Sequence, residues 1–193
     1  MDGVAVYVNK LNPLRRITLT QLDAVFSVTR HCGGEAPIET WDQLGIAGAL
    51  KTRRIVPYGL VDSTGAYHLF RDIALCGGDF KPDFQAMAGP DALESAIESQ
   101  PDALGFSSSA LHSAGIRPLA VASDGSSTAV PPDEANIRNR RYPLSRTLTI
   151  AVNLPPSGSL PPALKAFLDY VRSVQGQEVA AKAGYAPFKR ESP

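Results

Sequence analysis

The residues best suited to chemistry lie in a polar loop between a β-branched run and a segment with helical periodicity. The loop is Asp62, Ser63 and Thr64, and the helical pattern starts at Gly65 and Ala66. The first N–H groups of a helix have no partner within it, and the helix dipole places partial positive charge there. Such a loop either holds phosphate, sulfate or a carboxylate through backbone N–H groups, or is a capped helix start that binds nothing.

Elsewhere the sequence offers little for catalysis or metal binding. Ser107 opens a run of three serines but lacks the Gly-x-Ser-x-Gly context of an exposed nucleophile, and His68 lies one helical turn after Thr64. The histidines His31, His68 and His112 have no ligand partner at short spacing. We therefore expect no catalytic residue, no metal and no cofactor, with a small-molecule hydrolase built on Ser107 as an alternative.

Composition predicts a globular chain with an apolar core. The 193 residues are 44% hydrophobic, and 19 Lys and Arg balance 19 Asp and Glu. Binding of a nucleic-acid backbone needs clustered cations, whereas the arginine doublets are spread along the chain, so we expect no nucleic-acid partner. No apolar run approaches the roughly 20 residues that span a bilayer, and Met1 leads directly into a strand-like segment, so no signal peptide is expected here.

Periodicity predicts alternating strands and helices, which is typical of an α/β fold. Thr18 with Gln21 forms a capping-box pattern, Asp91 is expected to act as an N-cap, and a short helical turn at Trp41 is expected to end at Gly45. The predicted strands are 4–8, 55–58, 103–107, 116–121 and 148–153, and the predicted helices start at 18, 64, 90, 131 and 161.

Two cysteines have similar surroundings. Cys32 and Cys76 each precede a Gly-Gly pair, so both are expected in turns after helices. They can form a disulfide in an oxidising compartment or remain thiols in a reducing one, and the spacing leaves both possibilities open.

Several stretches, in their order, resemble the phosphate-binding proteins of bacterial ABC importers, which are two-lobed periplasmic solute receptors. The resemblance implies a non-enzymatic receptor that carries phosphate to a membrane permease and is periplasmic in the full-length protein. The matching stretches are 2–13, 19–27, 38–45, 103–107, 142–146, 176–179 and 184–188.

The resemblance also implies a domain organisation. Residues 1–10 are the strand that crosses between the lobes, 11–145 the second lobe, and 146–193 the return strand and C-terminal helices of the first lobe. The implied fold is a periplasmic-binding-protein-like lobe, with a mixed sheet flanked by helices. Most of the first lobe is missing, which suggests either an engineered fragment or a natural chain reduced to lobe two.

A C-terminal apolar stripe follows from the same organisation. Leu164, Phe167, Leu168 and Val171 belong against the first lobe in this family. We expect another surface to cover the stripe, either a second copy in a homodimer or the chain's own lobe.

The binding loop departs from the family pattern, in which an Arg is followed four residues later by Ser-Gly-Thr. Aligned on Gly65, the triplet here is Thr64, Gly65 and Ala66, and Leu60 stands at the Arg position. Thr64 keeps a hydroxyl, the next two residues keep N–H groups, and Asp62 is expected either to accept a protonated phosphate or to cap the helix. Losing the guanidinium is expected to weaken oxyanion binding by about ten- to a hundredfold.

Leu60 also favours a second class of function. A receptor lobe that has lost its ligand can serve as a protein-interaction or sensory accessory domain. The sequence therefore predicts a phosphate or oxyanion receptor, with this degenerate lobe as the alternative.

Overall fold

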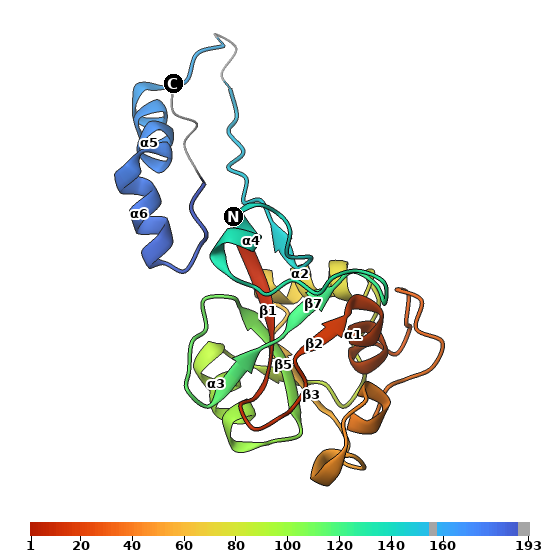
Figure 1. The fold of residues 1–193 in the computed structure, drawn as a ribbon. Coiled ribbons are helices and arrows are strands. Elements are labelled where there is room, and N and C mark those ends of the chain that lie inside the picture. The colour runs from red at the N-terminus through yellow and green to blue at the C-terminus, as the bar shows by residue number, and fades with distance from the viewer. Residues whose placement is uncertain (155–157, 189–193) are drawn as a thin grey trace.

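The structure is a computed structural model that describes residues 1–154 and 158–188 (Figure 1). A mixed sheet has the order β4–β3–β5–β1–β6, with β8 paired to β1, and β2 and β7 form a separate parallel pair. The strands are β1 (Asp2–Asn9), β2 (Arg16–Thr18), β3 (Val56–Leu60), β4 (Gln85–Met87), β5 (Ala103–Ser108), β6 (Ile116–Pro118), β7 (Ala120–Ala122) and β8 (Ser145–Arg146).

Helices cover both faces of this sheet, which confirms the predicted α/β class. Two short 3-10 helices, η1 (Trp41–Leu44) and η2 (Gly48–Leu50), precede β3. The α-helices are α1 (Leu19–Phe26), α2 (Gly65–Ala74), α3 (Pro90–Ser99), α4 (Glu134–Arg138), α5 (Pro162–Arg172) and α6 (Val174–Lys182).

Strand β1 is central, and both of its faces are buried. It pairs antiparallel with β5 on one side and with β6 on the other. Successive residues of a strand point to opposite faces, so Val4, Val6 and Val8 join the core beneath α1 and α2, whereas Ala5 and Tyr7 join the core beneath α3.

Aromatic packing fixes α2 on the sheet. The Phe70 ring stacks on Phe106 of β5 with centroids 3.9 Å apart, and Phe26 of α1 meets Phe70 edge-on at 5.0 Å. A side chain on Gly59 of β3 would collide with the Phe106 ring, so glycine is needed there for the ring to lie flat on the strand. This packing sets the place at which α2 begins.

The disulfide possibility is confirmed. Cys32 and Cys76 are joined, with Cα atoms 5.3 Å apart, and lie 44 positions apart in sequence. The bond ties the segment after α1 to the end of α2, and the backbone N–H of Cys32 also donates to the carboxylate of Asp23 at 2.6 Å.

Several local predictions are also confirmed. Thr18 and Gln21 form the capping box at the start of α1. Thr40 precedes the short turn at Trp41, and Gly45 ends it with a φ of 78°, a left-handed conformation that favours glycine.

Three local predictions are wrong. Gly89, not Asp91, is the N-cap of α3, because Pro90 takes the first helical position and Asp91 falls inside the first turn. The predicted strand 116–121 breaks at Leu119, since its first part pairs with β1 and its second part with β2. The predicted strand 148–153 is extended chain without a partner strand, and Leu148 and Ile150 are about half exposed.

The last two helices, α5 and α6, meet at Ser173 and form a unit, which we call the C-terminal hairpin, that stands apart from the body of the molecule (Figure 1). No residue of α5 is buried, and Phe167 of the stripe is 53% exposed, so of the two covering surfaces expected for the stripe, the chain's own lobe is not the one used. The tail after α6 returns to the body, where Met1 and Ala186 exchange backbone hydrogen bonds of 2.9 and 3.0 Å. Over the described residues, no helix has the length and hydropathy of a membrane span.

Removing the disulfide should destabilise the protein. A bond that closes a loop of this length lowers the entropy of the unfolded chain by an amount worth about 4 kcal/mol, and measured effects are typically about 2–4 kcal/mol. We expect the Cys32→Ala/Cys76→Ala variant to lose about that free energy of unfolding in urea titrations. Reduced native protein is the matched control, and an unchanged urea midpoint in both would contradict the prediction.

Candidate functional site

The side chain of Thr64 forms the N-cap of α2. Its backbone is extended, its Oγ1 accepts from the Tyr67 N–H at 3.2 Å, and its hydroxyl donates to the Val61 carbonyl at 2.8 Å. The interpretation of Asp62 as the cap is therefore wrong. Because the Thr64 hydroxyl proton is directed at Val61, this hydroxyl is not free to donate to an anion in this arrangement.

The next two residues present open donors. The hydrogen bonds of residues 1–154 and 158–188 include no partner for the N–H groups of Gly65 and Ala66. Gly65 is exposed, Ala66 is half-buried, and Asp62 and Ser63 are both exposed. The loop therefore presents backbone donors to solvent at the positive end of the α2 dipole.

Leu60 contributes no polar group to this loop. It is 5% exposed and lies in the apolar cluster with Ala5, Tyr58 and Ile97 on the α3 side of the sheet. Position 60, where the family pattern has an arginine, therefore has an apolar side chain in apolar surroundings.

Arg146 lies beside the loop, and sequence reasoning missed it. β8 pairs with the start of β1, and Arg146 Nε and Nη2 contact Asp2 Oδ2 at 3.1 and 3.0 Å. A Cβ atom built on Gly65 would lie 2.5 Å from Arg146 Nη2, so the guanidinium sits against the first residue of α2. The stretch 142–146 was a family match, but nothing local in it points to Gly65.

The hydrolase alternative lacks an accessible nucleophile. Ser107 is 0% exposed, and its buried Oγ has no hydrogen-bond partner. His68 is exposed on the surface of α2, with its ring 5.5 Å from that of Tyr67. Within the described residues, no group of three or more His, Cys, Asp or Glu side chains is placed to hold a metal ion.

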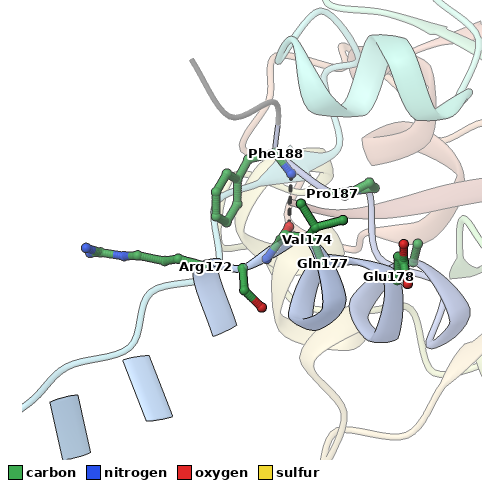
Figure 2. A pocket seen from close by; sticks show the side chains of 8 residues that line it. Arg172, Val174, Gln177, Glu178, Pro187 and Phe188 are labelled. Carbon is green, nitrogen blue, oxygen red and sulfur yellow. Dashed lines mark hydrogen bonds between the residues drawn. The ribbon is translucent and has the colours of Figure 1, made fainter. Parts of the chain in front are cut away.

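Cavities of moderate size lie away from the loop. One of about 270 Å³ lies between α6 and the tail, where Phe188 N–H donates to Gln177 Oε1 at 3.1 Å (Figure 2). Val174, Pro187 and Phe188 give it an apolar wall, and Arg172 and Glu178 lie at its margin. Its lining comes from the hairpin and tail alone, so it does not connect with the α2 loop.

The mixed sheet carries helices on both faces, and α2 begins after the end of β3 with N–H groups that are unpaired within the described part of the chain. Residues 1–175 match the PBP superfamily domain, and the chain belongs to this superfamily.

Two curated relatives refine the family. The chain is 34% identical over 188 residues to the phosphate-binding protein PstS of two Pseudomonas aeruginosa strains. The match covers 97% of this chain and 58% of each relative. The chain therefore spans little more than half the length of these relatives.

Solved structures share the fold. An ABC-type phosphate transport receptor from Vibrio cholerae superposes with a TM-score of 0.71 at 18% identity, covering 98% of this chain and 70% of that one. PstS from Borrelia burgdorferi gives a TM-score of 0.72 at 17% identity with the same coverage. At these identities the likeness establishes the architecture.

Removing the cap should destabilise α2. Thr64→Ala deletes the acceptor of the Tyr67 N–H, and loss of an N-cap typically lowers the free energy of unfolding by about 1 kcal/mol. Thr64→Ser keeps the hydroxyl and should lie within about 0.5 kcal/mol of the native protein. Both are measured by urea unfolding. Asp62→Ala is the control, and a loss there as large as in Thr64→Ala would contradict the cap assignment.

Proposed function

We propose that the chain is the substrate-binding part of an ABC importer for phosphate or a related oxyanion, without enzymatic activity. The observation that carries this proposal is the open helix start at Gly65 and Ala66 in a chain 34% identical to phosphate-binding proteins. The proposed ligand contacts are the N–H groups of these two residues, with Asp62, Ser63 and Thr64 completing the loop. In the full-length protein this receptor is periplasmic and presents its ligand to a membrane permease.

The disulfide supports the proposed location. Disulfides persist in oxidising compartments such as the bacterial periplasm and are rare in the cytosol. The bond between Cys32 and Cys76 joins two segments of the lobe that carries the loop.

We also propose the two-lobe organisation for the full-length receptor. Residues 1–10 form a crossing strand, 11–145 the second lobe, and 146–193 the return segment and helices of the first lobe. Two features support this division: the chain from 147 to 154 has no partner strand, and no residue of α5 is buried although α5 contacts α6. Both are expected where a large neighbouring lobe is absent.

Phosphate should perturb the start of α2 in solution. A loop with few charge-assisted hydrogen bonds should bind inorganic phosphate with a dissociation constant on the order of 1 mM. We expect saturable chemical-shift changes at the amides of Gly65 and Ala66 in a ¹⁵N NMR titration, because their N–H groups contact the anion. The first-turn amides of α3 are an internal control for a generic helix terminus.

Two other outcomes decide between the functions. Shifts at α2 with both phosphate and sulfate support a broader oxyanion site. Silence of the α2 amides toward both anions contradicts the receptor proposal and favours the degenerate lobe, which Leu60 at the arginine position supports.

The exposed hairpin supports one further proposal, a homodimer of this chain through its C-terminal helices. Phe167 of the stripe, its neighbour Tyr170 and Val174 at the start of α6 are each more than half exposed, so apolar surface is left uncovered on both helices. An apolar stripe of this kind is typical of an interaction surface. When this chain is studied without further domains, a second copy covers the exposed apolar surface of α5 and α6 with its own equivalent surface.

Charge on the stripe should separate the copies. We expect the native chain to sediment as a concentration-dependent dimer, and Phe167→Glu to sediment as a monomer, because a carboxylate cannot be buried unpaired in an apolar interface. Lys165→Gln changes the opposite side of α5 and should leave the dimer intact. Sedimentation equilibrium measures all three, and a native chain that stays monomeric at all concentrations would contradict the proposal.

A further inference from the structure

A guanidinium packs directly on the backbone at the start of α2. Arg146 Nη2 lies 2.5 Å from the point a Cβ on Gly65 would occupy, and Cζ lies 3.5 Å from it. Gly65 begins a regular helix and does not have a positive φ, so its conformation does not require glycine. The requirement at this position is space, because any side chain would displace the guanidinium.

The charges around this contact are unfavourable in the absence of an anion. The helix start carries a partial positive charge, and the guanidinium adds a full one beside it. Asp2 offsets part of this charge, because one of its oxygens accepts from Nε and Nη2 at 3.1 and 3.0 Å. Nη1 has no partner among the hydrogen bonds and ion pairs of the described residues, and the Arg146 side chain is 34% exposed.

Arg146 also has a fixed position. Asp2 is 15% exposed, and the pairing of β8 with β1 places the two residues opposite each other. A guanidinium held on one edge keeps its other nitrogen available in a defined direction, which suits recognition of a tetrahedral oxyanion.

We propose that Arg146 is a ligand-binding residue, and that its guanidinium serves the oxyanion in place of the arginine that position 60 lacks. The proposal rests on the proposed function and names a further contact of the same site. The anion would lie between Nη1 of Arg146 and the N–H groups of Gly65 and Ala66. Its negative charge would then relieve the repulsion between the guanidinium and the helix start.

The test compares phosphate affinities by the ¹⁵N titration of the α2 amides. Arg146→Gln removes the charge but keeps a donor for Asp2, and it should weaken phosphate binding at least tenfold. Arg146→Lys keeps a point charge without the planar fork and should give an intermediate affinity. Arg54→Ala removes a positive charge from an exposed pair with Glu39 and should bind phosphate like the native chain.

Gly65→Ala provides an independent variant that leaves Arg146 in the sequence. The added methyl group displaces the flexible end of the arginine, so the helix should fold normally while phosphate binds at least severalfold more weakly. If the methyl acts through Arg146, the Gly65→Ala/Arg146→Gln double variant should bind no more weakly than Arg146→Gln alone.

The outcomes separate the two proposals. A native response to phosphate that Arg146→Gln leaves unchanged overturns the role of Arg146 but not the receptor function. Additive losses in the double variant also overturn it, because the methyl would then act on the ligand directly. Absence of any native response to phosphate overturns both.

Discussion

The stacking of Phe70 on Phe106 is the contact on which the candidate site depends. It joins the middle of α2 to the sheet, and glycine at position 59 lets the ring lie flat across β3. The helix can therefore begin only near the carboxyl end of β3, where the loop at Thr64 turns its backbone donors outward. In open α/β sheets this edge is where ligands bind.

Much of this region follows from short-range patterns. Thr18 and Gln21 lie three residues apart, so their spacing predicts a capping box, and the structure contains it. The helical spacing after Thr64 likewise locates α2, and the Gly-Gly pairs place both cysteines in turns. The N-cap of α2 is harder to predict from sequence, because Asp62 and Thr64 are both good capping residues and only the path of the backbone selects between them.

The rest depends on contacts between distant parts of the chain. Arg146 pairs with Asp2, which is 144 positions away in sequence. No local pattern indicates that the Arg146 guanidinium lies against Gly65. The segment 148–153 has the alternation of a strand, but alternation describes one strand and says nothing of whether a neighbour exists to pair with it. The break at Leu119 has the same origin, because residues before it pair with β1 and residues after it pair with β2, and no local pattern shows which strands lie nearby.

The two attachments of the hairpin have a mechanical consequence. The chain leaves the body after β8 and returns where Ala186 meets Met1, next to the first residues of β1. A unit held by two neighbouring tethers turns about the line between them more readily than it separates, which is the geometry of a hinge. Arg146 stands just before the chain leaves the body, and its pairing with Asp2 of β1 holds it on the body side of that axis.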